Sequence, residues 1–182
     1  MFDGDYTITG KHATYLKYLA AKNARDDEDG ATSSAKIFER YIDVYMNAAI
    51  WGLLYSRTAP KDNTSDSRAR IYADAFSKER DNCVFLYRMV MLLDKTSEID
   101  STERVNRTFR YDSDKEKKAE FQNNLELFNS YVRGGIEQMY EEFTSGCSTR
   151  DDYLNKVYEI MTDFKNEIEG HSYEDDLAAL LR

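Results

Sequence analysis

Apolar residues recur every three or four positions over most of this chain of 182 residues, which is the period of an amphipathic helix. No segment reads as a set of strands at regular spacing. Long helices are predicted for four segments: 34–58, 65–94, 114–144 and 150–169. Shorter helices are predicted for 11–22, for 102–109 and for a last segment that begins at Ser172.

Glycine and proline mark the ends of these segments, because both residues are unfavourable inside a helix. Most of them fall between periodic segments: Gly4, Gly10, Gly30, Pro60, Gly146 and Gly170. Ser113 with Glu116, and Thr149 with Asp152, have the spacing of a helix-capping pair. We therefore expect an all-α fold: a helical bundle of four long helices, with short helices at the N- and C-terminal ends and in the 102–109 connection.

The chain is expected to form a single helical domain, 1–182, because its length suits one hydrophobic core. An acidic loop at about 23–33 has no apolar anchor, and we expect it to be mobile. The longest apolar run, 48–55, is far too short to span a membrane, and no signal peptide is visible. Cys83 and Cys147 lie far apart in sequence, so we predict a reduced, cytoplasmic protein.

Three glycines lie inside the periodic segments rather than between them. Gly52 falls on the apolar seam of 34–58, and Gly134 and Gly135 fall within 114–144 without changing its register. Each costs about 1 kcal/mol relative to alanine inside a helix, so some other interaction must offset that cost. A close contact between helices and a kink are both consistent with the pattern.

The net charge of −9 is distributed unevenly along the chain. Residues 57–110 carry 11 basic and 9 acidic side chains, whereas residues 111–182 carry 8 basic and 17 acidic. Arginine binds phosphate through two nitrogens at once, so the basic middle segment predicts an anion or nucleic-acid site. The candidate residues are Arg57, Arg68, Arg70, Arg104, Arg107 and Arg110. The alternative is that these arginines pair with acidic side chains of the same chain.

One acid, Glu79, interrupts the otherwise apolar seam of the predicted helix 65–94. A carboxylate on a packed face needs a cationic partner or a raised pKa, so Glu79 is a candidate buried acid. The simpler interpretation is a less buried position or a neighbouring arginine.

The sequence contains none of the usual catalytic or metal-binding motifs. His12 and His171 are far apart, and there is no Glu-x-x-His pair, zinc-type Cys/His spacing or glycine-rich phosphate loop. No nucleophile elbow is present either. We therefore predict no metal, no cofactor and no catalytic residue.

Abundant packing seams and 14 tyrosines predict a non-catalytic helical interaction module. Such a module would be a small subunit or adaptor of a larger intracellular assembly, with protein partners and with a homodimer as a further option. The alternative is a nucleic-acid-associated accessory subunit of a DNA or RNA processing or defence complex that uses the basic 57–110 segment. A helical enzyme with a carboxylate-rich pocket has the least support.

Overall fold

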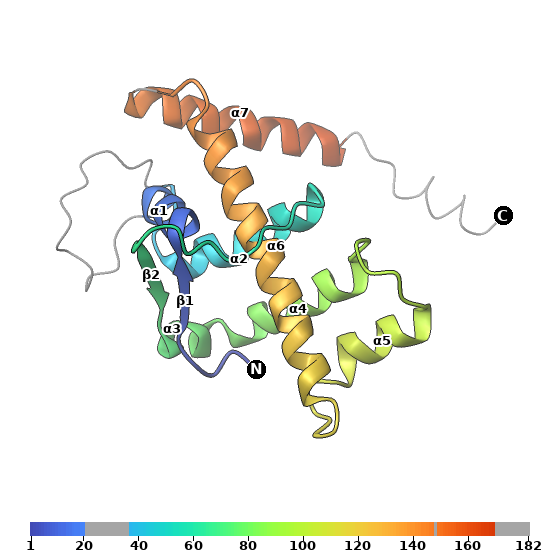
Figure 1. The fold of residues 1–182 in the computed structure, drawn as a ribbon. Helices are drawn as coiled ribbons and strands as arrows, with labels where there is room; N and C mark the ends of the chain where they lie inside the picture. The colour runs from blue at the N-terminus through green and yellow to red at the C-terminus, as the bar shows by residue number, and fades with distance from the viewer. Residues whose placement is uncertain (21–36, 148, 170–182) are drawn as a thin grey trace. The chain divides into compact units, whose positions relative to one another are not determined.

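The computed structural model describes residues 1–20, 37–147 and 149–169. This part of the chain is mostly helical, with seven helices and two short strands (Figure 1). It divides into two compact units, Met1–Glu142 and Phe143–Arg182. The predicted acidic loop at 23–33 and the helix predicted from Ser172 lie outside the described residues.

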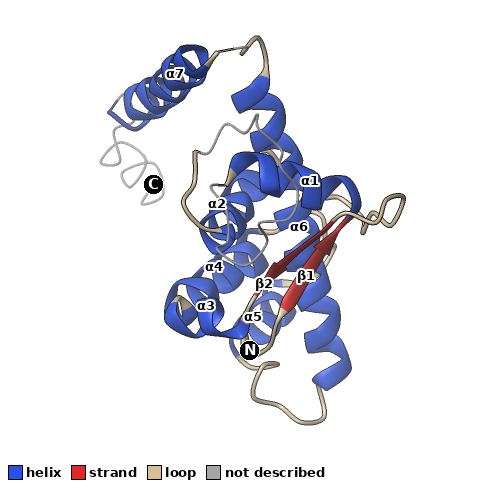
Figure 2. Ribbon diagram, turned by 90° about the vertical axis from the view of Figure 1, so that its left-hand side faces the viewer, coloured by secondary structure: helices blue, strands red, loops and turns tan. Residues whose placement is uncertain are grey.

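A two-stranded antiparallel sheet lies in the first unit (Figure 2). Strand β1 (Tyr6–Thr9) pairs with β2 (Arg68–Ile71), with Tyr6 opposite Ile71 and Thr9 opposite Arg68. In β2 the side chains alternate between exposed and buried, and Ala69 and Ile71 face the core. The prediction of helix from residue 65 was therefore wrong. Burial alternates every second residue in this part of the segment, as in a strand, and the helical spacing of three to four residues applies only further along.

The rest of the predicted helix 65–94 is two helices rather than one. Helix α3 (Ala73–Lys78) and helix α4 (Arg80–Leu93) are separated by Glu79, whose φ of −106° and ψ of 18° lie outside the helical range. The bundle of four long helices is therefore not the observed arrangement, because one of its four members is a strand and two shorter helices.

The first two helices of the chain are shorter than predicted. Helix α1 (Gly10–Leu19) follows β1 directly, and helix α2 (Tyr41–Leu54) begins seven residues after the predicted start at 34. The Asp43 side chain accepts a hydrogen bond from the Arg40 backbone N–H at 3.0 Å, which satisfies a donor at the start of α2. Helix α2 ends at Leu54, before Pro60. Just after this end, the Arg57 N–H donates a hydrogen bond of 2.8 Å to the Gly52 carbonyl.

The later helices match the sequence pattern more closely. Helix α5 (Ser101–Phe109) and helix α7 (Arg150–Glu169) have nearly the predicted bounds. Helix α6 begins later than predicted, at Lys118, and runs to Thr144. Thr149 and Asp152 exchange two hydrogen bonds of 2.7 and 3.2 Å, so the predicted cap of α7 is present. The Ser113 hydroxyl bonds to the Arg110 carbonyl instead, and no capping box forms there.

At the three glycines that the sequence places inside helices, α6 approaches closely the backbone of α2 or of the segment that directly follows it. A Cβ atom on Gly135 would lie 1.8 Å from the Ala48 carbonyl oxygen, and one on Gly52 would lie 2.1 Å from that of Tyr131. On Gly134 it would lie 2.1 Å from the Arg57 carbonyl oxygen. Helix α6 continues unbroken through both of its glycines. The geometry therefore supports a close contact, rather than a kink, as the reason for these residues.

Aromatic side chains fill the core next to this crossing. The Phe128 ring on α6 meets the rings of Tyr45 and Tyr87 edge-on, with centroids 6.0 and 5.8 Å away. The Tyr45 hydroxyl donates to the Asn129 side chain at 2.8 Å, so its polar group remains bonded while the ring is buried.

None of the described helices is both long and apolar enough to cross a membrane.

The α2–α6 contact makes a prediction for stability. Gly135→Ala should lower the free energy of unfolding by about 1–3 kcal/mol, because the new methyl group forces the helices apart. This loss would appear although alanine favours the helix by about 1 kcal/mol. Urea unfolding measures it, with Gly4→Ala as the control because nothing lies within 4 Å of a Cβ there. Equal stability of the two variants would contradict the prediction.

Candidate functional site

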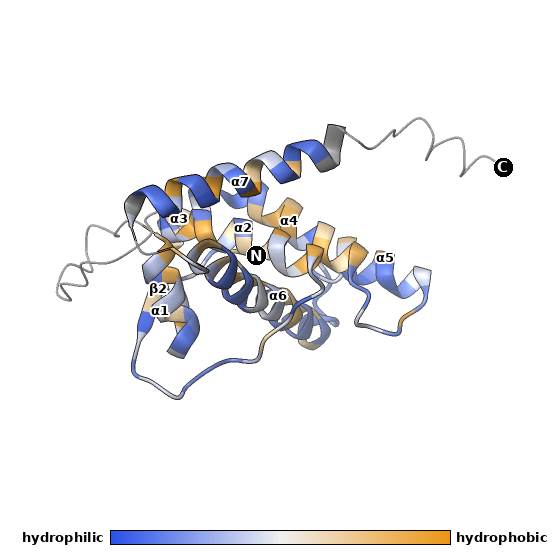
Figure 3. Ribbon diagram, turned by 90° about the horizontal axis from the view of Figure 1, so that it is seen from above, coloured by the Kyte–Doolittle hydropathy of each residue, from blue (hydrophilic) through white to orange (hydrophobic). Residues whose placement is uncertain are grey.

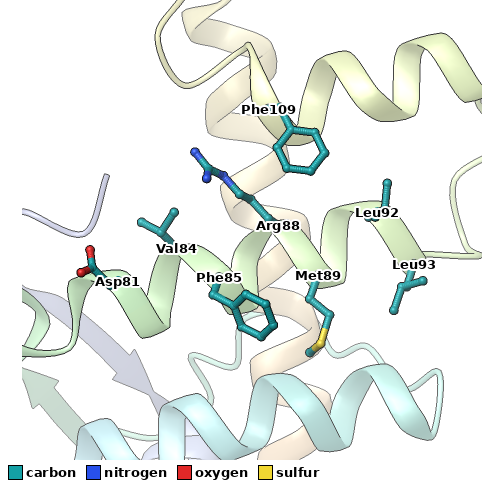
Figure 4. Close-up of a pocket in the computed structure, with 8 residues that line it drawn as sticks. All are labelled: Asp81, Val84, Phe85, Arg88, Met89, Leu92, Leu93 and Phe109. Carbon is teal, nitrogen blue, oxygen red and sulfur yellow. The ribbon is translucent and has the colours of Figure 1, made fainter.

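An apolar groove with a volume of about 530 Å³ runs along the outer face of α4. Its lining residues come from α4 and from the end of α5 (Figure 4): Asp81, Val84, Phe85, Arg88, Met89, Leu92, Leu93 and Phe109. The sequence analysis missed this groove, because it assigned one packed face to the segment. The available signal was a second set of apolar positions, at Phe85, Met89 and Leu92, with the same helical spacing.

Helix α4 is thus apolar on two sides. Cys83, Tyr87 and Val90 are fully buried in the core, whereas the Phe85 side chain on the other side is 66% exposed. Figure 3 shows hydrophobic residues along α4. A helix that is apolar all round is normally covered on every side, and an exposed apolar patch of this kind commonly marks an interaction site.

Arg88 is the cation of the groove lining. Its guanidinium lies 5.6 Å from the centre of the Phe109 ring, and its Nη2 atom is 3.8 Å from the Asp112 carboxylate. Its Nε atom has no hydrogen-bond partner within the described residues. The Nε atom is buried, but the Arg88 side chain as a whole is 40% exposed and its ion pair is long, so the groove offers a positive charge beside its apolar floor.

A buried ion pair holds α5 beside α4. Asp94, which ends α4 and is 1% exposed, accepts hydrogen bonds from Arg107 Nη2 at 2.9 Å and from the Tyr131 hydroxyl at 2.6 Å. Burial by itself would raise the pKa of Asp94, but hydrogen bonds from Ser97, Thr96, Tyr131 and Arg107 lower that pKa well below its usual range. This pair fixes where α5, and hence Phe109, lies along the groove.

Arg104 and Arg107 are brought together, and both bind the C-terminal end of α4. Arg107 donates to the Met91 carbonyl through Nε at 3.2 Å and through Nη2 at 2.7 Å. Arg104 donates to the carbonyl oxygens of Asp94 and Leu92. The carbonyls at a helix end lack partners within the helix and carry partial negative charge, so they suit these guanidinium groups.

A third arginine, Arg57, is also paired within the chain. It donates to Glu137 at 2.8 Å and to Glu141 at 2.6 and 2.7 Å, and it accounts for much of the lowering of the Glu141 pKa. This contact is the pairing with acidic side chains that the sequence analysis gave as its alternative.

The other three predicted arginines are exposed. Arg68 and Arg70 lie on β2, and the guanidinium of Arg70 is 3.9 Å from Asp5, while Arg110 follows α5. The six arginines thus belong to several separate parts of the fold. The structure does not gather them on one surface.

Glu79 is partly exposed rather than buried, with a side chain that is 18% accessible. It accepts hydrogen bonds of 2.9 Å from the Asn82 amide and from Arg40, and both interactions lower its pKa. Arg40 therefore neutralises the Glu79 carboxylate, as the simpler of the two interpretations expected.

A charged cluster between α1 and α6 had no signal in the sequence, because its members are more than a hundred residues apart. His12 is fully buried, and its Nε2 atom lies 2.8 Å from Glu137 Oε1, which also binds Lys11 at 2.9 Å. Burial lowers the pKa of His12 and outweighs the opposing effect of Glu137. Lys11 and Arg57 already neutralise that carboxylate, so His12 remains uncharged.

No protein-family model, no curated protein and no solved structure matches this chain.

The ion pair beside the groove should be essential for stability. Arg107→Ala should lower the free energy of unfolding by about 3–5 kcal/mol, because it leaves Asp94 buried without its cation. Arg110→Ala, on the exposed neighbour, should change the stability by less than about 0.5 kcal/mol. Chemical denaturation of both variants measures the difference. A small effect of Arg107→Ala would show that Asp94 does not depend on it.

The buried His12 should make stability depend on pH. Its pKa lies below the ordinary 6.5, so the unfolded chain binds the proton more readily than the folded one. The free energy of unfolding should therefore fall as the pH decreases from 7 to 5.5, by less than about 1.4 kcal/mol per pH unit. His12→Gln should flatten this dependence in urea unfolding series, whereas His171→Gln should retain it. Equal slopes for wild type and His12→Gln would refute the assignment.

Proposed function

We propose that this protein is a helical interaction module that binds an amphipathic helix of a protein partner in the α4 groove. The observation that carries the proposal is the groove itself: about 530 Å³ on the outside of a helix whose inner face is already buried. Helices dock into such grooves by placing apolar side chains of successive turns against the floor.

The residue types of the lining support a protein partner. Phe85 and Phe109 are large rings that can anchor a bound helix, and Met89 adapts its shape to irregular surfaces. Interface centres are enriched in aromatic residues and methionine and depleted in charge, which describes this groove apart from Arg88 in its middle and Asp81 at one end. We propose that the chain acts in this way as a small subunit or adaptor of a larger intracellular assembly.

Electrostatics narrows the class of partner. The charged residues of the groove lining are Arg88 and, at one end, Asp81, because Arg104 and Arg107 are bound to groups at the end of α4. Arg88 lies in the groove with incomplete pairing. A partner helix with a carboxylate next to its apolar stripe would satisfy Arg88 and be favoured over a basic helix.

The nucleic-acid alternative has no comparable observation in its favour. The guanidinium groups of Arg57, Arg104 and Arg107 donate hydrogen bonds to acceptors of this chain. A test of that alternative should use Arg68→Ala and Arg110→Ala, because these side chains are exposed and their removal should leave the fold intact.

The groove should bind a model ligand of the proposed chemistry. A fluorescent synthetic peptide of leucine, phenylalanine, glutamate and lysine, arranged as an amphipathic helix, should bind with micromolar affinity in an anisotropy titration. A peptide of the same composition with its stripe scrambled should bind at least about tenfold more weakly.

Phe85→Ser should weaken binding of the amphipathic peptide by about tenfold or more, because it removes the anchor of the groove. Leu54→Ser is the matched control, since Leu54 is similarly exposed, at 63%, but does not line the groove. Circular dichroism should show unchanged helix content for both variants. If the two peptides bind equally, or if both variants bind equally, the proposed function is wrong.

A further inference from the structure

A second exposed apolar surface lies on α7, in the other unit of the chain. Leu154, Tyr158, Met161 and Phe164 follow one another at helical spacing, and each is at least half exposed. Hydrophilic and hydrophobic residues alternate along α7 in Figure 3, as expected for a helix with one apolar stripe. This is the form of ligand that the groove is proposed to bind.

Arg88 offers a charge contact between the two surfaces. Helix α7 carries six acidic and three basic side chains, and Arg88 is the cation among the residues that line the groove, with Asp81 at one end of that lining. Glu159 and Asp163 are next to stripe residues in sequence, and although Glu159 forms an ion pair of 3.0 Å with Lys156, both carboxylates lie near the apolar contact. The weakly paired Arg88 is the group in the groove that such a carboxylate would satisfy.

The lengths also agree. The stripe from Leu154 to Phe164 extends for about 15 Å along α7, and the outer apolar face of α4 from Phe85 to Leu93 extends for about 12 Å, at 1.5 Å per residue. One face is a helix with acidic side chains beside its stripe, and the other is a groove whose lining includes Arg88 and, at one end, Asp81. The two surfaces therefore match in size and apolar character, and Arg88 is available to a carboxylate of α7.

We infer that the groove of one copy of this protein binds α7 of a second copy, and that the reverse contact forms at the same time. This inference rests on the proposed function and names the partner. Two reciprocal contacts close the assembly as a two-fold dimer, so that both apolar surfaces of each chain are covered. The dimer joins unlike surfaces, groove to helix, and this property separates it from a dimer that joins groove to groove.

Analytical ultracentrifugation of the full chain tests the inference. The wild type should dimerise at micromolar concentrations. Phe85→Ser in the groove and Met161→Ser on α7 should each weaken dimerisation by about 30-fold or more, because each removes a central apolar anchor from both contacts. Leu54→Ser and Asn155→Ser are the controls on the two helices α2 and α7, and they should dimerise like the wild type.

Mixing the two variants makes the test specific. The Met161→Ser chain keeps an intact groove, and the Phe85→Ser chain keeps an intact α7, so one complete contact can form between them. Phe85 and Met161 are expected to pack on each other, so the contact that carries both substitutions loses this anchor pair only once. The mixture should therefore dimerise about fivefold more tightly than either variant alone. A variant that had lost its fold could not restore the dimer in this way, so the mixture also controls for misfolding.

A wild type that stays monomeric overturns the inference, as does a dimer that is insensitive to either variant or a mixture no tighter than its components. The proposed function is decided separately, with the synthetic amphipathic peptide and the Met161→Ser chain. If the Met161→Ser chain binds the peptide but the wild type forms no dimer, only the choice of partner is refuted. If the Met161→Ser chain does not bind the peptide and the wild type forms no dimer, the groove is refuted as a binding site.

Discussion

The close crossing of α2 and α6 is the constraint on which the rest of the first unit depends. At Gly52 and Gly135 the backbone of one helix occupies the space that a Cβ atom of the other would need, and at Gly134 the backbone of Arg57, just after α2, does the same. Such an approach brings more backbone and side-chain atoms into contact than larger residues would allow, which offsets the cost of glycine in a helix. The crossing fixes α6 in place, and α6 then positions the side chains that hold its neighbours.

Those side chains connect the crossing to the groove. Tyr131, beside the glycines, donates to Asp94 at the end of α4, and Asp94 binds Arg107 of α5. Helix α5 thereby lies along α4 with Phe109 in the groove lining. A similar set of bonds from Glu137 holds α1 through Lys11 and His12. Buried charges are costly unless paired, so each of these contacts accepts few alternative arrangements.

The surfaces that the fold leaves uncovered are its main functional clue. One apolar side of helix α4 is buried in the core, and a second apolar side, which includes Phe85, is exposed. Folding alone gives no reason to leave this side exposed, because burying apolar area is the main driving force of folding. The proposed binding of a partner helix would give such a reason, and Arg88 in the groove lining would favour a partner with a carboxylate beside its apolar stripe.

The sequence by itself determined the helical class, the bounds of α5 and α7, and the positions of the three glycines in α2 and α6. These features depend on periodicity and on residues only a few positions apart, such as Thr149 and Asp152, so a local pattern contains them. It missed β2, because a four-residue strand is stabilised by pairing with β1 some sixty residues earlier.

Only the tertiary structure decided what the charged side chains do. Arg104 and Arg107 looked like a phosphate site, yet their partners are helix-end carbonyls and a buried aspartate that the fold brings beside them. His12 gave no signal, because its partner Glu137 is 125 residues away. The groove likewise appeared only once one side of α4 was seen to be buried and the other open. The physical reason is that hydrophobic period is a local property of the chain, whereas burial and charge pairing depend on which distant segments the fold brings together.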